Sequence, residues 1–177
     1  GLLEQSSQLI GLKDDPPASV AGLTRRADSD LERFEATLRS EGYYASTLSF
    51  EIDETSNPIS VVVLVQTGPA YMLAAYDVSF VTPVSQPGLV RTELKGLGLT
   101  LGARAQAAEI LTVEQRILTD LGAAGQPFAR VVDRATVVDH ATHALTVTLQ
   151  IDPGPAMAFG PLHVAGLEAV APDYVTD

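Results

Sequence analysis

A chain of 177 residues that is 46% hydrophobic and 19% charged has enough apolar material for one large or two small folded cores, which excludes a disordered protein. The formal charge of −11 at pH 7 repels phosphate backbones, so we expect no nucleic-acid partner. Without cysteine, neither a disulfide framework nor a thiolate metal site is available. The chain starts at Gly1 without a signal peptide, and its longest branched apolar run, residues 61–65, is too short to cross a bilayer. We therefore expect an excised soluble piece of a longer protein.

The first half of the sequence predicts two helices followed by two strands. A short helix is expected at residues 2–10, and a longer amphipathic helix begins after Asp15, the expected N-cap before two prolines. Gly42 suits the left-handed position that ends this helix. Residues 48–52 alternate between apolar and polar, and residues 59–66 are apolar at nearly every position, which predicts a strand buried on both faces or at a sheet centre. The apolar stripe of the long helix has helical spacing: Val20, Leu23, Ala27, Leu31, Phe34 and Leu38.

The second half repeats this order with one strand added in front. Residues 72–81 alternate as a strand, and a short helix is expected at residues 87–97. A longer helix follows and ends at Gly125, and strands are expected at residues 128–138 and 144–151. One more strand is expected at residues 159–164, with no helix after it. The stripe of the second long helix is Ile110, Val113, Ile117 and Leu121.

These two halves are copies of one unit. The tetrapeptide Gly-Pro-Ala-Tyr at residues 68–71 recurs as Gly-Pro-Ala-Met at residues 154–157, an offset of 86 residues. We therefore expect an α+β protein built from β-α-α-β-β modules, each with a three-stranded sheet covered on one face by two helices. The expected boundaries are 1–68 for a first module that lacks its opening strand, 69–155 for a second module, and 156–177 for the opening strand of a third. The joint at residues 67–71 should act as a limited hinge.

Two motifs could carry chemistry, and for each the structural interpretation is favoured. His140 and His143 could supply half of a metal site, but a zinc site needs further ligands, and a polar hairpin turn explains both residues. His163 is expected to face solvent. The glycine-rich run at residues 96–102 follows a helix rather than a strand, so it is interpreted as a turn between helices and not as a phosphate-binding loop.

Acidic pairs do not form a catalytic site in this interpretation. Asp14, Asp15, Asp28 and Asp30 are expected in proline-rich or helix-surface positions, where carboxylates cap helices and complement their dipoles. The sequence has no nucleophile elbow and no cysteine nucleophile. We therefore expect no enzymatic activity, no cofactor and no bound metal.

The module order, the period and the Gly-Pro that opens each copy resemble POTRA (polypeptide-transport-associated) domains, which precede a membrane β-barrel in outer-membrane assembly proteins of the BamA and TamA superfamily. Residues 125–133 (Gly-Gln-Pro-Phe-Ala-Arg-Val-Val-Asp) and 152–167 are most similar to the TamA branch. The resemblance implies a periplasmic docking and chaperoning role. It also implies as partners unfolded outer-membrane or secreted clients, a TamB-like inner-membrane-anchored protein, and a β-barrel in the same parent chain.

In this family the strand after the second helix lies at a sheet edge, where an extended client can pair through main-chain hydrogen bonds. The corresponding strands are Thr47–Asp53 and residues 128–138. The resemblance thus gives as partner-binding residues Leu48, Ser49, Phe50, Glu51, Ile52, Arg130, Val131, Val132, Asp133 and Arg134. Two alternatives stay open: a docking scaffold of a secretion-type or cell-division POTRA protein, and a small hydrolase, which would need a deep pocket with perturbed titratable groups.

The phase of the repeat predicts self-association. Strand 59–66 should have one unpaired side, while residues 158–165 form a spare opening strand with no module of its own. The tail of one chain is therefore expected to fill the gap in another chain by strand exchange. The alternative is an edge that stays exposed to solvent in a loosened first module.

Overall fold

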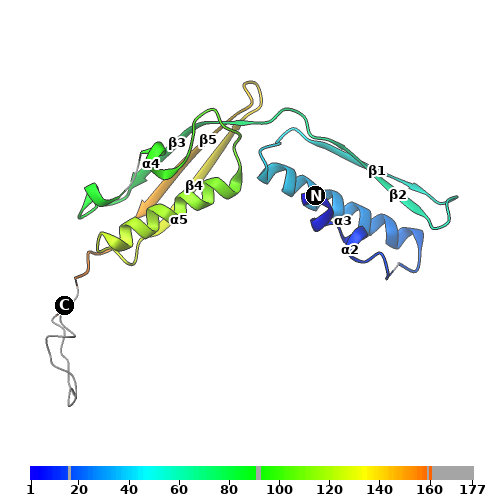
Figure 1. Ribbon diagram of the computed structural model, residues 1–177, viewed down its shortest axis with the longest axis horizontal. Helices are drawn as coiled ribbons and strands as arrows, with labels where there is room; N and C mark the ends of the chain where they lie inside the picture. The colour runs from blue at the N-terminus through cyan, green and yellow to red at the C-terminus, as the bar shows by residue number, and fades with distance from the viewer. Residues whose placement is uncertain (16, 91–92, 159, 161–177) are drawn as a thin grey trace, which may run out of the picture.

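The computed structural model describes residues 1–15, 17–90, 93–158 and 160. Two separate sheets, each with a long helix lying along it, follow one another along the chain (Figure 1). We call residues 1–66 the N-terminal half and residues 71–157 the C-terminal half. The α+β class predicted from the sequence is confirmed by this arrangement. Among the described residues, no helix is long and apolar enough to cross a membrane.

The N-terminal half contains α1 (Leu2–Ser6), α2 (Gln8–Gly11), α3 (Val20–Ser40), β1 (Thr47–Asp53) and β2 (Ser60–Gln66). The predicted N-cap of the long helix, Asp15, is wrong. The helix begins four residues later, where the Ser19 side chain accepts a hydrogen bond from the Gly22 amide at 3.2 Å. Gly42 follows the helix end with φ of +86°, as predicted.

A buried carboxylate binds the N-terminal segment at the point where its helix is interrupted. The single helix predicted at residues 2–10 is two helices separated at Ser7, whose backbone is extended. Asp30 on α3 accepts hydrogen bonds from the Ser7 hydroxyl at 2.6 Å and from the amides of Gln8 and Leu9 at 2.7 and 2.9 Å. Asp30 is fully buried, so the prediction of a helix-surface position is wrong for this residue. Its carboxylate satisfies amide groups that the start of α2 leaves unpaired.

The C-terminal half contains β3 (Met72–Phe80), a 3-10 turn η1 (Pro87–Leu89), α4 (Leu94–Leu97), α5 (Ala107–Ala123), β4 (Arg130–Asp139) and β5 (Ala144–Asp152). Its sheet has the order β3-β5-β4, with β5 parallel to β3 and antiparallel to β4. The predicted order of one strand, two helical segments and two strands is thus present. The short helix expected at residues 87–97 is divided into η1 and α4.

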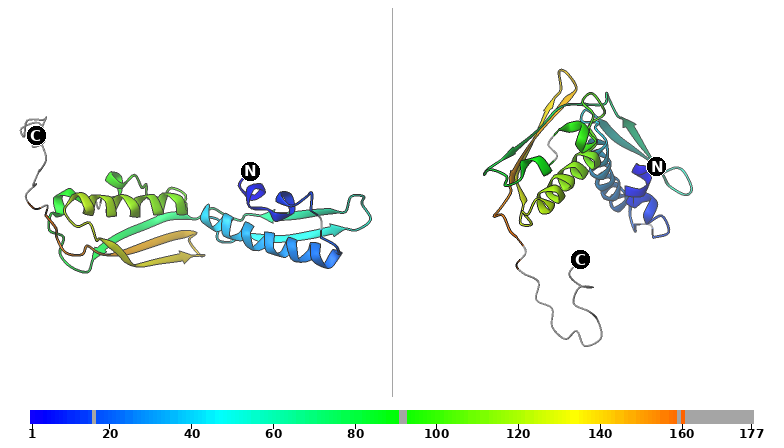
Figure 2. Two further views of the ribbon diagram at one scale, coloured as in Figure 1. Left: turned by 90° about the horizontal axis from the view of Figure 1, so that it is seen from below. Right: turned by 60° about the vertical axis from the view of Figure 1, so that its left-hand side comes forward.

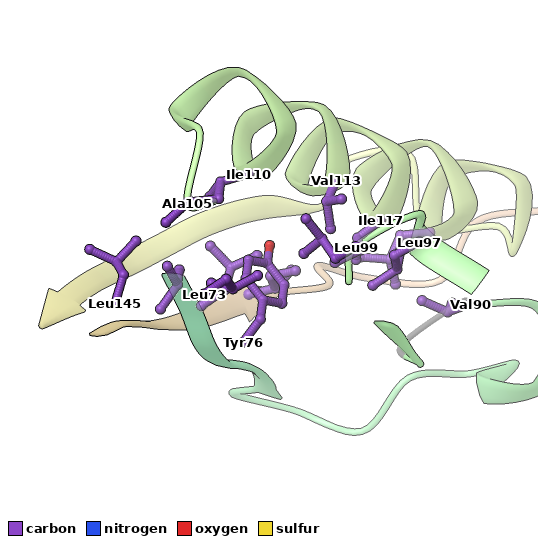
Figure 3. Close-up of a cluster of buried hydrophobic side chains, with 14 of the residues drawn as sticks. Leu73, Tyr76, Val90, Leu97, Leu99, Ala105, Ile110, Val113, Ile117 and Leu145 are labelled. Carbon is purple, nitrogen blue, oxygen red and sulfur yellow. The ribbon is translucent and has the colours of Figure 1, made fainter. Parts of the chain in front are cut away.

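The core of the C-terminal half lies between β5 and α5. Every second residue of β5 is fully buried, namely Leu145, Val147, Leu149 and Ile151, while Thr148 and Gln150 between them are exposed. The predicted stripe of α5 packs against them, and Leu73, Tyr76 and Leu97 complete the cluster from β3 and α4 (Figure 3). In this half, β5 therefore has a strand partner on each side, β3 and β4.

The sheet of the N-terminal half has only two strands among the described residues. β1 and β2 pair antiparallel, and β2 has no second strand partner there. The expectation that residues 59–66 are buried on both faces or central in a sheet is wrong. Val62 and Leu64 are 51% and 47% exposed on one face, and Ile59 at the start of the segment is 46% exposed. An apolar strand is buried only where neighbours cover it, and here one flank and one face lack them.

Candidate polypeptide-binding surface

The outer edges of β1 and β4 are strand edges without a pairing partner among the described residues. All ten residues predicted to bind a partner lie on these two strands. Such edges present backbone donors and acceptors that can pair with another polypeptide. The structure thus places the predicted residues on edges of two different sheets, and it does not bring the two sets together in one site. That these residues bind a partner stays a prediction.

The β1 edge is regular. All seven residues of β1 pair with β2 without a register shift. Leu48, Phe50 and Ile52 are half-buried, and α3 packs against this strand. Ser49 and Glu51 between them are exposed. A straight strand with one covered face and one polar face can add a further strand without disturbing its own core.

The β4 edge is irregular. Its register shifts between Val131 and Asp133, which marks a bulge, and Val132 within it is 44% exposed. Two of the predicted residues are held in ion pairs inside the C-terminal half. Arg130 contacts Asp152 at 2.9 Å, and Arg134 contacts Glu114 of α5 at 3.1 Å. A bulge twists an edge and interrupts continuous pairing. The β1 edge is therefore more regular than the β4 edge.

Carboxylates are fixed at the ends of β1 and β5. The hydroxyl and amide of Thr55 hydrogen-bond the Asp53 carboxylate and hold its pKa below the usual range. The Gly154 amide, followed by the Arg130 side chain, lowers the pKa of Asp152 in the same way. In the core behind β4, burial, followed by the charge of Glu114, raises the pKa of Tyr76 to about 12. The carboxylates at these strand ends therefore stay ionised near neutral pH.

Sequence reasoning predicted the open flank of β2 but missed an apolar groove beside it. The groove has a volume of about 710 Å³ and lies between α2, the start of α3 and the beginning of β2. Leu9, Leu12 and Leu23 contribute from the helices and the segment after α2, and Ile59 and Val61 from the β2 side. The signal that could have found it is the continuous apolar run in a strand with only one predicted neighbour.

The joint between the halves is a second feature that sequence reasoning missed. The Tyr71 amide donates to the Gly42 carbonyl at 2.8 Å, and Arg104 contacts the Glu41 carboxylate at 3.2 Å. The ring of Tyr71 is fully buried and stands edge-on to Tyr44. The two halves are thus joined by side chains and backbone as well as by covalent linkage. The repeated Gly-Pro-Ala predicted a joint but not these contacts.

The two histidines of the β4–β5 turn belong to this joint. His140 Nδ1 lies 2.6 Å from the Tyr71 hydroxyl, and the His143 ring stands edge-on to the Tyr71 ring. Among the described residues, no three His, Cys, Asp or Glu side chains gather as a metal site would require. His163 lies outside the described residues. The arrangement explains the His140 and His143 side chains as packing around a buried tyrosine.

No family model matches this sequence, and no curated protein matches it. Among solved structures, the chain is similar to POTRA domains 3–5 of BamA from Haemophilus influenzae, with 20% identity over 98% of this chain and 68% of that chain and a TM-score of 0.48. POTRA domain 4 of the same protein matches with 27% identity over 50% of this chain and 97% of that chain, at a TM-score of 0.40. POTRA domains 1–2 of Omp85 from Anabaena match with 18% identity, 72% and 74% coverage, and a TM-score of 0.44.

Proposed function

We propose that this chain is a non-catalytic scaffold of tandem POTRA modules that binds extended polypeptides at a sheet edge in the periplasm. The observation that carries the proposal is the outer edge of β1, a strand of seven residues in unbroken register with one face covered by α3 and no partner on its outer side among the described residues. Main-chain pairing at such an edge tolerates many client sequences. The proposed module boundaries are residues 1–68, 69–155 and 156–177.

The finer part of the proposal concerns the partners. The residue pattern at 125–133 and 152–167 supports a TamA-like protein that receives unfolded outer-membrane or secreted clients. Such a protein works with a TamB-like inner-membrane-anchored partner and passes clients to a β-barrel in the same parent chain. Leu48, Ser49, Phe50, Glu51 and Ile52 form the principal client edge. The second client edge, which pairs more weakly, consists of Arg130, Val131, Val132, Asp133 and Arg134. A bulge interrupts backbone pairing there, and both arginines are engaged in ion pairs.

Hydrogen exchange with an added client peptide tests this assignment. A synthetic strand of alternating apolar and polar residues should slow amide exchange in Thr47–Asp53 more than in Arg130–Asp139. Ser49→Pro should weaken binding because proline removes a backbone donor, whereas Ser49→Ala should bind as the unchanged chain does. Far-UV circular dichroism confirms that both variants are folded. Equal losses from both substitutions would indicate side-chain recognition and contradict the proposal.

A further inference from the structure

The outer edge of β3 is paired over its first residues and open over its last ones. The Leu73 amide donates to the Ala103 carbonyl at 2.8 Å, and the Gly102 amide donates to the Leu73 carbonyl at 2.8 Å. The bridge at this place is antiparallel. Beyond Leu73, β3 has no partner on its outer side among the described residues. The strand that the sequence predicts at residues 159–164 lies outside the described residues and is no part of this edge.

The backbone groups of the open part point away from the rest of the sheet. The Val81 amide donates to the Ile151 carbonyl at 2.9 Å, so Val81 directs its backbone towards β5. Successive residues of a strand direct their backbone groups to opposite sides, and every second residue before Val81 therefore faces β5 as well. The residues between them, Tyr76, Val78 and Phe80, direct their amides and carbonyls to the open edge. Such an edge can pair with an extended polypeptide.

An apolar groove of about 640 Å³ lies beside this open part. Val78 and Phe80 line it from β3, and Pro87 and Val90 line it from η1 and the residue after it. None of the described residues that line it is charged. Val78 and Phe80 pack against the core but are only half-buried, whereas Leu73, where the edge is paired, is 2% exposed. Apolar side chains of an added strand would remove this surface from water, which is favourable.

The carboxylate of Asp77 lies on the other face of the same strand. α5 packs along one face of the sheet and leaves the opposite face open (Figure 2). Asp77 is exposed on that open face, where Thr148 of β5 and then Ala135 of β4 are its neighbours. No basic side chain among the described residues forms an ion pair with it. A lysine or arginine opposite Asp77 on an added strand would therefore meet an unpaired negative charge. The formal charge of −11 attracts such a partner from a distance as well.

We propose that the open part of the β3 edge, residues 76–80, binds an extended polypeptide with apolar residues at alternate positions and a lysine or arginine between two of them. The added strand runs antiparallel to β3, as the segment at residues 102–105 already does. Its apolar residues pair with Val78 and Phe80 and face the groove, and its basic residue pairs with Asp77. This site is separate from the outer edges of β1 and β4, so it goes beyond the proposed client binding.

Amide chemical shifts of the full chain, titrated with synthetic peptides, test where and what this edge binds. The probe is a capped peptide with valine at alternate positions and one central lysine, and its matched control has glutamate in place of the lysine. The lysine peptide should shift the amides of residues 76–80. It should also bind on the order of 5-fold more tightly than the glutamate peptide, because a cross-strand ion pair replaces a like-charge contact. Shifts confined to residues 47–53 overturn this proposal and leave the β1 edge as the binding site. Binding of neither peptide overturns it too.

Two pairs of variants separate the backbone from the charge. Val78→Pro removes an outward amide and should weaken binding of the lysine peptide on the order of 10-fold, whereas Val78→Ala keeps the amide and should weaken it clearly less. Asp77→Asn should abolish the preference for lysine over glutamate, and Glu109→Gln on the exposed side of α5 should leave it unchanged. Far-UV circular dichroism checks folding, and the Asp77→Asn result decides if the proline variant unfolds. Equal losses from two folded Val78 variants, or a lysine preference that survives Asp77→Asn, overturn the proposal.

Discussion

β2 and β5 are equivalent strands of one repeat with a similar apolar stripe on one face, yet β5 has a strand partner on each side and β2 has one partner among the described residues. Along the buried face of β5, Leu145 and Val147 are fully buried, whereas Val61 is half-buried and Ile59 is 46% exposed. The opposite face also differs, because β5 has Thr148 and Gln150 there and β2 has valine and leucine. The comparison shows that burial of a strand is decided by its flanking strands and not by its own composition.

The two halves also anchor their short helices differently. In the N-terminal half, the Asp30 carboxylate on α3 accepts hydrogen bonds from amides at the start of α2. In the C-terminal half, the Arg116 guanidinium on α5 donates to the Leu97 carbonyl at the end of α4, at 2.6 Å. An anion at a helix start and a cation at a helix end both satisfy unpaired backbone groups. In each half a charged side chain of the long helix thus satisfies backbone groups of a short helix.

The largest effect is expected from removing that carboxylate. Asp30→Ala should lower the free energy of unfolding of the N-terminal half by about 3 kcal/mol, because three donors lose a charged acceptor in a buried place. Asp28→Ala on the exposed side of α3 is the control and should change it by less than about 0.5 kcal/mol. Urea unfolding followed by far-UV circular dichroism measures both. Equal small effects would show that α1 and α2 are held by apolar packing alone.

One substitution made in both halves tests the comparison of β2 with β5. Val147→Ala should cost about 2 to 3 kcal/mol, since it opens a cavity in a closed core. Val61→Ala at the equivalent position should cost less than about 1 kcal/mol, because the side chain is only half-buried. Thermal or urea unfolding of the two variants gives the difference. If both cost the same, the flank of β2 is covered in solution.

Alkaline pH should destabilise the C-terminal half through Tyr76. Above about pH 10 an unfolded tyrosine loses its proton, while burial keeps the folded Tyr76 protonated up to its pKa of about 12. The unfolded state then binds fewer protons, so the free energy of unfolding falls as pH rises, by about 2 kcal/mol between pH 10 and 12. Unfolding curves for the chain and for Tyr76→Phe measure it. The same loss in the Tyr76→Phe chain would assign the effect to another group.

Much of the fold could be predicted from the periodic spacing of apolar residues, and the predictions that failed have local causes. The stripes of α3 and α5 and the ends at Gly42 and Gly125 depend on helical spacing and positive φ, both of which are visible in sequence. The start of α3 could not be predicted, because Ser19 and Asp15 compete as the capping residue. The burial of Asp30 could not be predicted either, because its partner Ser7 lies 23 residues away in the sequence. The groove beside β2 and the contacts of Tyr71 depend on how separate elements meet, which spacing along one strand does not encode.

Amide hydrogen exchange in a dilute, monomeric sample most directly tests the claim that β2 has an open flank. The account predicts that amides of Ser60–Gln66 exchange on the order of 100-fold faster than those of Ala144–Asp152, because local opening of a two-stranded sheet exposes far less apolar surface than opening of the closed core. Equal protection of the two strands, in a sample that light scattering shows to be monomeric, would contradict it.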